Sequence, residues 1–207
     1  MNGDDRSEDD PPENAATDEW PVDLVGVTES LVTTLGPNHL WNVAALGLHA
    51  GDPVTATTFG KTRTWRNFRK TGQGYVQFTP DPELFVEAAL SVEERAEPVL
   101  DEADAWAEVA VDSVGVEDEG GTRKEEWALR PVDGTVVARR PHTTNRGYYA
   151  VIEATVAASR LDVDAYDTAT LVDRLAYFEE VAKTCGGPSE RAAFDRLSTL
   201  VDWRDAI

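Results

Sequence analysis

Three segments near the N-terminus have the composition and spacing of adjacent antiparallel strands. Residues 24–35, 40–49 and 54–59 are rich in Val and Thr, and short turn sequences containing Gly, Pro, Asn or Asp separate them. Strands that follow one another at such short spacing pair as hairpins. The pattern therefore predicts an antiparallel meander, and any fold of this chain must contain that sheet.

The sequence indicates three regions. Residues 1–19 contain eight acids and almost no large apolar side chain, which predicts a disordered acidic tail. Residues 20–140 predict a β domain of about seven strands with two inserted helices, a number of strands that a small barrel can close. Residues 141–207 change to helical periodicity and predict a C-terminal domain of three helices.

Two further local patterns lie in the second half of the β domain. The stretch 91–104 is acidic and is expected to cross the surface. Residues 127–131 and 135–139 are predicted to form a hairpin around Asp133 and Gly134, because Asp-Gly favours a tight turn.

An excess of acids runs along the whole chain. Asp and Glu number 39 against 19 Lys plus Arg, and the formal net charge is −20. An acidic surface costs little in self-repulsion in molar salt, where the Debye length is about 3 Å. The composition therefore predicts a halophilic origin, in preference to a protein designed to meet a basic partner.

Several functional classes are disfavoured by what the sequence lacks. Cys185 is the only cysteine and the three histidines have no metal-ligand spacing, so neither a disulfide nor a metal site is expected. No apolar run approaches the roughly 20 residues that span a bilayer, and the N-terminal stretch is acidic. We expect a cytoplasmic protein that makes no membrane contact.

Catalytic residues cannot be named from the sequence. No nucleophile elbow, Walker motif or dinucleotide-binding glycine motif is present. Glu29 lies among valines and threonines in the first predicted strand. If it is buried it needs a partner, which the sequence does not identify.

The stretch from Lys61 to Lys70 is basic in this acidic chain. It has five Lys or Arg and no acid in ten residues. Thr62 or Thr64 can cap a helix that runs to about Lys70, and Gly72 can end it. Free N–H groups at the helix start, threonine hydroxyls and basic side chains outline a phosphate site. The alternative is a solvated basic helix face. Nucleic acid is an unlikely ligand, because binding to its phosphates weakens steeply with salt.

A second polar cluster precedes the first C-terminal helix. It contains Arg139, Arg140, His142, Asn145 and Arg146. This cluster can also bind an anion at a helix start, or it can be an interdomain linker that forms salt bridges with acidic neighbours. Two such clusters without an acid/base pair favour a phosphorylated cofactor that supplies its own chemistry.

Five stretches of this sequence resemble a known family. They are LVGVTESLVTTLGPN, WNVAALGLHAGDPVTATTFGKTRTWRNF, GYVQFTPDPELFVEAAL, NRGYYAVIEATVAASRL and CGGPSERAAF. They are similar to the archaeal DUF447 proteins of the FMN-binding split-barrel superfamily, which also contains flavin reductases and pyridoxamine-phosphate oxidases. The resemblance implies a mainly β fold with α, in which an FMN-binding split β-barrel is followed by a small helical domain. It also implies a homodimer with FMN at the interface between barrels.

The resemblance also implies which residues hold FMN. The strand NVAALG would lie along the isoalloxazine ring, the segment KTRTWRN would hold the phosphate, and an Asn-Arg pair would approach the flavin, with the second subunit as one source. The implied cofactor-binding residues are Asn42, Ala44, Ala45, Thr57, Lys61, Thr62, Arg63, Thr64, Asn67, Asn145 and Arg146. Many flavin reductases of this superfamily carry Ser or Thr with Pro beside the ring strand, where this chain has Ala44, Ala45 and Leu46. Reductase activity therefore does not follow from the resemblance alone.

The favoured function is an FMN-binding flavoprotein, a flavin reductase-like oxidoreductase that takes electrons from NAD(P)H. A non-catalytic flavin or nucleotide carrier is the first alternative, because no general acid or base is recognisable. A nucleic-acid accessory protein that uses the two basic clusters is the less favoured one.

Overall fold

The computed structural model of the chain describes residues 19–119 and 122–206. The predicted acidic tail therefore lies, apart from Glu19, outside the described residues. Seven strands form one sheet. Their bounds are β1 Val27–Leu35, β2 Trp41–His49, β3 Val54–Phe59, β4 Gln73–Phe78, β5 Glu93–Arg95, β6 Ala105–Glu119 and β7 Thr122–Val136.

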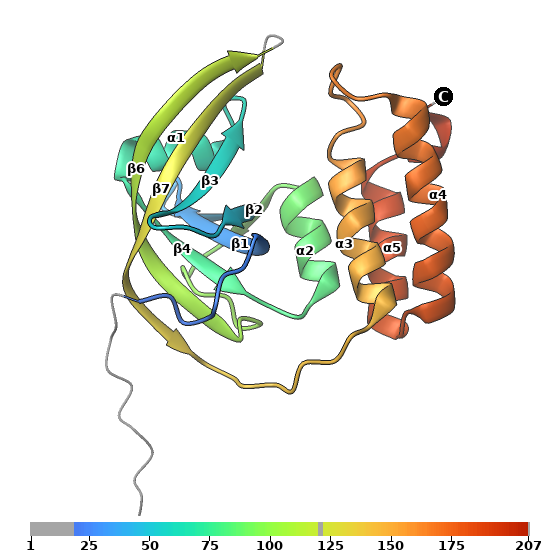
Figure 1. Cartoon of the computed structure of the whole chain (residues 1–207), viewed down its shortest axis with the longest axis horizontal. Coiled ribbons are helices and arrows are strands. Elements are labelled where there is room, and N and C mark those ends of the chain that lie inside the picture. The colour runs from blue at the N-terminus through green and yellow to red at the C-terminus, as the bar shows by residue number, and fades with distance from the viewer. Residues whose placement is uncertain (1–18, 120–121, 207) are drawn as a thin grey trace, which may run out of the picture.

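The sheet closes into a barrel. Its strand order is β1-β4-β6-β7-β3-β2-β5, and an additional β1–β2 pairing joins the first strand to the sixth. All the strand pairs are antiparallel, and β1 and β2 pair over their full length as the predicted meander requires. The expected split β-barrel followed by helices is confirmed (Figure 1).

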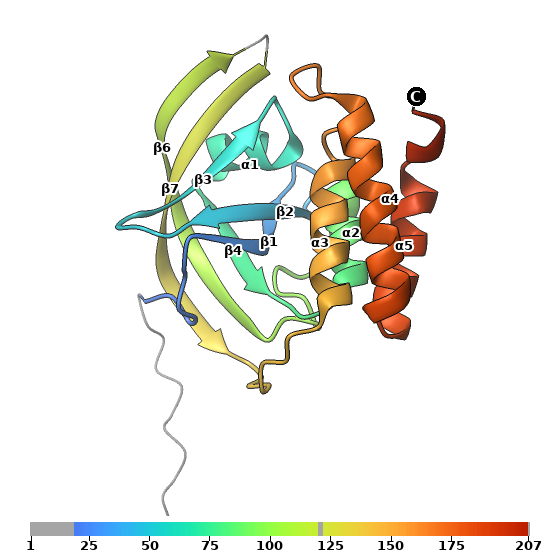
Figure 2. The same ribbon diagram turned by 45° about the vertical axis from the view of Figure 1, so that its right-hand side comes forward.

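The helices occupy two places in the chain. Their bounds are α1 Arg63–Thr71, α2 Pro82–Leu90, α3 Arg146–Ala158, α4 Thr168–Cys185 and α5 Pro188–Leu200, followed by a short 3₁₀ turn, η1 Trp203–Asp205. Figures 1 and 2 show α1 against the barrel, whereas α2 lies beside α3, α4 and α5 in a helical layer on the opposite side. We refer to these four helices as the helical layer.

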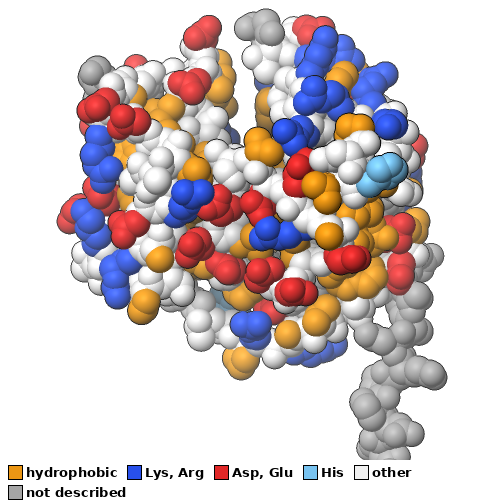
Figure 3. All heavy atoms as spheres, turned by 180° about the vertical axis from the view of Figure 1, so that it is seen from behind, with side chains coloured by type: hydrophobic (Ala, Val, Ile, Leu, Met, Phe, Trp, Pro, Cys, Tyr) orange, Lys and Arg blue, Asp and Glu red, His pale blue; other side chains and the backbone are white. Residues whose placement is uncertain are grey.

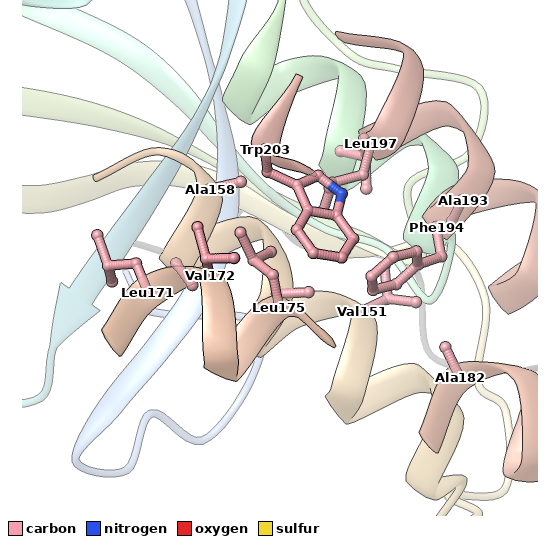
Figure 4. Packing of buried hydrophobic residues seen from close by; sticks show 13 residues of the cluster. Val151, Ala158, Leu171, Val172, Leu175, Ala182, Ala193, Phe194, Leu197 and Trp203 are labelled. Atoms are coloured by element: carbon pink, nitrogen blue, oxygen red, sulfur yellow. The ribbon is translucent and has the colours of Figure 1, made fainter. Parts of the chain in front are cut away.

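The helical layer has a hydrophobic core of its own. Leu175, Leu197 and Trp203 are buried in it, together with Val86 of α2, and Figure 4 shows the Trp203 ring among the leucines and Phe194. Glu87 of α2 also forms an ion pair with Arg196 of α5. A helix inserted between two barrel strands therefore contributes both apolar and charged contacts to the C-terminal helices.

The prediction of a hairpin within residues 127–139 is wrong. The structure has one continuous strand, β7, which runs through Asp133 and Gly134 and pairs with the equally long β6. The register shifts between Glu108 and Val109, so Val132 is an extra residue that bulges out of the ladder. A bulge absorbs an irregular Asp-Gly sequence without a reversal of the chain.

The strand β5 was not predicted. It comprises only three charged residues, Glu93–Arg95, within the acidic stretch that was expected to cross the surface. It adds to the edge of β2, with Asn42 opposite Glu94. This pairing brings an acid next to the start of β2.

The helix α1 lies against one side of the barrel. Its inner residue Phe68 is buried in the barrel core and packs edge-to-face on Trp127, with ring centroids 5.4 Å apart. Thr62 caps its start and Gly72, with φ 65°, ends it, as the sequence predicted. Among the described residues, no helix is long and apolar enough to cross a membrane.

Candidate functional site

The start of α1 presents unused backbone donors. The Thr62 hydroxyl accepts a hydrogen bond from the Trp65 N–H at 3.2 Å, and the first turn contains no acid. The N–H groups of Arg63 and Thr64, the first two residues of the helix, have no carbonyl partner within it. Together with the positive end of the helix dipole, these donors favour an anion in front of α1.

A cavity of about 510 Å³ lies alongside α1, and we call it the α1 cavity. It is enclosed by the turn between β1 and β2, the start of β2, one face of α1 and the strand β5. Its lining residues are Gly36, Pro37, Asn38, Asn42, Arg63, Arg66, Asn67, Lys70 and Glu94. The four α1 residues stand three, four and seven positions apart, so they share one face of the helix.

The charge in the α1 cavity is net positive. Arg63 donates to Glu94 at 2.8 Å, and Glu94 also accepts a hydrogen bond from the Asn38 amide at 3.2 Å. Arg66 and Lys70 form no ion pair with any residue of the ranges 19–119 and 122–206. Figure 3 shows Lys and Arg side chains gathered at the upper right, over α1, on a face where acids otherwise predominate. The α1 cavity therefore keeps cations available for an anionic ligand.

Two nearly buried amides complete the wall of the α1 cavity. The Asn67 side chain is 5% exposed, and its amide nitrogen donates to the Thr34 hydroxyl at 3.0 Å, which holds the side chain in position. Asn42 is also 5% exposed, and its side chain has no hydrogen-bond partner among the described residues. A buried amide normally has a partner. The Asn42 amide is thus a candidate to bind a ligand.

The opposite side of α1 is held by a buried acid, Glu125 of β7. Its carboxylate accepts hydrogen bonds from the Trp65 indole at 2.6 Å, from Arg69 at 2.9 Å and from the Ser113 hydroxyl at 2.8 Å. Arg123 adds an ion pair at 3.4 Å. The Glu125 side chain is fully buried and is surrounded by donors, so it fixes the rotation of α1 about its axis.

The environment of Glu125 also sets its ionisation. Burial by itself raises the pKa of this carboxyl group, but the hydrogen bonds from Trp65 and Ser113, together with the charge of Arg69, outweigh burial. The net pKa lies below the ordinary value of 4.5, so the group remains a carboxylate at neutral pH.

The structure brings together only some of the residues that the resemblance implied. Arg63, Asn67 and Asn42 line the α1 cavity, and Thr62 and Thr64 belong to the same helix start, where Thr64 is buried. The remaining residues of that segment, Thr57 and Lys61, lie at the end of β3 and in the loop to α1. Thr57 is half-buried and Lys61 is exposed.

The two alanines of β2 and the Asn-Arg pair lie elsewhere. Ala44 packs against the barrel core and Ala45 against the cluster around α2, and neither lines the α1 cavity. Asn145 caps α3 by accepting from the Gly147 N–H at 2.8 Å, and Arg146 is exposed beside it. Within one chain this pair also lies outside the lining of the α1 cavity.

Several residues of this region were not assigned individually from the sequence. Arg66 and Lys70 could have been, because their spacing from Arg63 places them on the same helix face. Glu94 could not, since only the unpredicted pairing of β5 with β2 brings it to the α1 cavity. The burial of Glu125 could have been predicted, because it stands at alternate positions with Trp127 and Leu129 and shares their inward face of the strand.

The fold and the site together define a class of protein. It has a closed antiparallel barrel with a helical layer on one side, and a cavity suited to an anion beside α1 on the other side. Residues 28–138 match the N-terminal domain of a family described as a protein of unknown function (DUF447), and residues 145–199 match the DUF447 domain that follows it. The chain belongs to the DUF447 family.

The chain is similar to several solved structures. An FMN-bound DUF447 protein from Methanosarcina mazei superposes with a TM-score of 0.72 at 25% identity, over 86% of this chain and 96% of that one. The flavin reductase HpaC complexed with NADP⁺ gives a TM-score of 0.37 at 18% identity, over 56% and 81%. Nitrilotriacetate monooxygenase component B from Bacillus cereus gives 0.39 at 15% identity, over 60% and 76%.

Proposed function

We propose that this protein is an FMN-binding flavoprotein that holds the FMN phosphate in the α1 cavity. The observation that carries the proposal is the pair of unmatched cations, Arg66 and Lys70, on the cavity face of α1 beside the free N–H groups of the helix start. An FMN-bound relative that covers most of this chain supports the choice of ligand.

The residues of the α1 cavity fit a phosphate monoester. A dianion needs several donors and compensating positive charge, and the cavity offers two guanidinium groups, an ammonium group and the backbone donors of α1. The Asn42 amide supplies a further donor with no other partner among the described residues. The volume of about 510 Å³ lies within the range of small-molecule sites.

The proposed activity is electron transfer from NAD(P)H through the flavin. Bound FMN would supply the redox chemistry itself, and the chain's own residues would bind and orient it. A carrier without catalytic activity is the second candidate, favoured by one observation. Among the described residues, Glu94 is the only carboxylate that lines the α1 cavity, and it is paired with Arg63 and is not free to act as a base.

The phosphate assignment is tested with Arg63. Lysine keeps the charge but loses the planar fork of donors, so Arg63→Lys should weaken FMN binding less than Arg63→Ala does. The alanine change removes a charge-assisted contact of about 1.5 to 3 kcal/mol, which corresponds to a roughly ten- to hundredfold weaker FMN affinity. Fluorescence titration measures both variants against the wild type.

Riboflavin and a remote arginine provide the controls. Riboflavin lacks the phosphate, so its affinity should hardly respond to either Arg63 change. Arg204→Ala removes an exposed arginine from η1, in the helical layer, and should leave FMN binding unchanged. If Arg63→Ala weakens FMN and riboflavin equally, or weakens neither, the phosphate is bound elsewhere.

Enzyme and carrier are separated by anaerobic reduction. The FMN-loaded protein is mixed with NADH or NADPH, and the absorbance of the flavin is followed. Bleaching at a rate well above that of free FMN supports the oxidoreductase. An unchanged rate supports the carrier.

The proposal includes a homodimer in which Asn145 and Arg146 approach the flavin of the partner subunit. In one chain these residues lie outside the lining of the α1 cavity, so we propose a second copy as the source of their contact with the flavin. Sedimentation of the FMN-loaded protein should give a dimer, and Arg146→Ala should weaken FMN binding. A flavin-loaded monomer that binds FMN with full affinity would contradict this part of the proposal.

A halophilic origin is proposed on composition. With 39 acids and 19 bases, dilution of salt lengthens the range of charge repulsion and should destabilise the fold. The melting temperature should fall between molar and low-millimolar KCl. No change over that range would count against a halophilic origin.

A further inference from the structure

A second cavity, of about 440 Å³, lies between the barrel and the helical layer. We call it the interlayer cavity. Its walls come from the first half of β1, the end of β4, Phe85 of α2 and one face of α3; Figure 2 shows β1 and β4 on one side of this region and α2 and α3 on the other. Glu29 in its wall and Gly36 in the α1 cavity, just past the end of β1, lie seven residues apart, which is about 23 Å at about 3.3 Å per residue. The two cavities are therefore distinct.

Most of the interlayer cavity is apolar and aromatic. Leu31, Phe85, Ile152 and Val156 line it, with the rings of two adjacent tyrosines on α3. Tyr148 and Tyr149 meet edge-to-face, with ring centroids 5.6 Å apart. Such walls accommodate the hydrocarbon part of a ligand, and the faces of the tyrosine rings can also attract a cation.

Several polar groups in the walls are already satisfied. The Ser30 hydroxyl donates to the Leu46 carbonyl at 2.7 Å. The Gln77 side chain donates to the Pro98 carbonyl at 3.0 Å and accepts from the Leu100 N–H at 2.6 Å. These groups are occupied by the protein itself and offer little to a ligand.

Glu153 is also occupied, whereas Glu29 is not. Glu153 forms an ion pair with Arg174 at 3.0 Å. Glu29 forms no hydrogen bond or ion pair with any residue in the described parts of the chain. Glu29 is exposed at the lining of the interlayer cavity, so its carboxylate needs no partner from the protein and is accessible to a ligand.

We propose that the interlayer cavity binds an organic cation, namely an amine with an apolar or aromatic body, whose charged head pairs with Glu29 and whose body packs against Tyr149 and Ile152. The unpaired carboxylate of Glu29 favours a positively charged head group, and the apolar and aromatic walls favour an apolar or aromatic body. The proposal is independent of FMN, because no residue lines both cavities.

The titration of Glu29 supports the charge preference. Burial raises the pKa of Glu29 above the ordinary value of 4.5; Arg160, in the turn after α3, and His49 on β2 lower it, and Glu153 on α3 raises it. A cation binds the ionised form, so its affinity should fall as the pH drops through this raised pKa.

The test uses three matched probes on the full chain, with and without FMN. Phenethylamine, 2-phenylethanol and phenylacetate share a body and differ in the charge of the head group. Calorimetric titration should show the amine binding about tenfold more tightly than the alcohol, and phenylacetate not binding, because Glu29 attracts only the cation. The ring-proton NMR signals of Tyr148 and Tyr149 should shift on addition of the amine.

Two isosteric variants complete the experiment. Glu29→Gln should bring the affinity for the amine down to that for the alcohol. Glu153→Gln, which removes an acid already paired with Arg174, should change the affinity for the amine by less than about threefold. Equal binding of amine and alcohol, no effect of Glu29→Gln, no binding of any probe, or competition between the amine and FMN would each overturn the proposal.

Discussion

The two sides of α1 carry similar side chains under opposite conditions. On the barrel side, Arg69 and the Trp65 indole are matched by the buried Glu125, which leaves no acceptor of that carboxylate unused. On the cavity side, Arg66 and Lys70 have no acidic partner in the described chain. Basic side chains that are paired with a buried acid therefore position the helix, whereas unpaired basic side chains on the same helix are available to a ligand.

The largest effect is expected at Glu125. Glu125→Gln removes the carboxylate but leaves the buried indole and the partly buried guanidinium groups around it, so the free energy of unfolding should fall by about 3 kcal/mol. Chemical denaturation measures this loss. A change below about 0.5 kcal/mol would mean that the barrel side of α1 is not held by this network.

The pH dependence of stability sharpens the same point. The pKa of Glu125 is lowered in the folded state, so its ionised form stabilises the fold above the ordinary value of 4.5, and this contribution is lost as the pH falls through the folded pKa. The difference in unfolding free energy between the wild type and Glu125→Gln should therefore shrink at acid pH. A difference that stays constant down to about pH 3 would contradict the assigned ionisation.

The next effect separates the two sides of α1 by ligand binding. Arg66→Ala should weaken FMN binding about tenfold and change the unfolding free energy by less than about 0.5 kcal/mol, because the side chain is exposed and unpaired. Arg69→Ala is the matched control on the same helix. It should lower stability and leave the affinity for FMN unchanged. If Arg69→Ala weakened FMN binding and Arg66→Ala lowered stability instead, the barrel side of α1 would bind the ligand and the cavity side would position the helix.

The smallest effect concerns Glu94, the one acid of the α1 cavity. It competes with a phosphate for Arg63, and this half-exposed pair is weak. Glu94→Gln should therefore strengthen FMN binding about two- to fivefold without changing riboflavin binding. Weaker FMN binding in this variant would show that Glu94 contacts the ligand itself.

Local signals in the sequence predicted α1 well, and long-range pairing explains what they missed. Thr62, one of the two predicted caps, and Gly72 sit where helix caps are expected, so the bounds of α1 could be read to within two residues. The strand β5 has a charged sequence without alternation, and only the edge of β2 makes it a strand. The turn signal at Asp133 and Gly134 was overridden because β6 supplies a partner along the whole of β7.

The candidate site divides in the same way. The basic face of α1 follows from helical spacing, so most of the phosphate donors could be predicted from the sequence. The acid Glu94 and the turn residue Asn38 come from elsewhere in the chain, and only the closed barrel places them beside α1. The interlayer cavity was not predictable, because it depends on how α3 lies opposite β1 in the folded chain.

The position of α2 has a consequence for how this family can change over evolutionary time. The helix is encoded between β4 and β5, yet Val86 is buried in the core of the C-terminal helices. A lineage that lost or exchanged α3 to α5 would leave this apolar face uncovered in the middle of its barrel sequence. Recombination near residue 140 is therefore constrained. The sequence that encodes the barrel and the sequence that encodes α3 to α5 have to be inherited together, unless the apolar residues of α2 are also substituted.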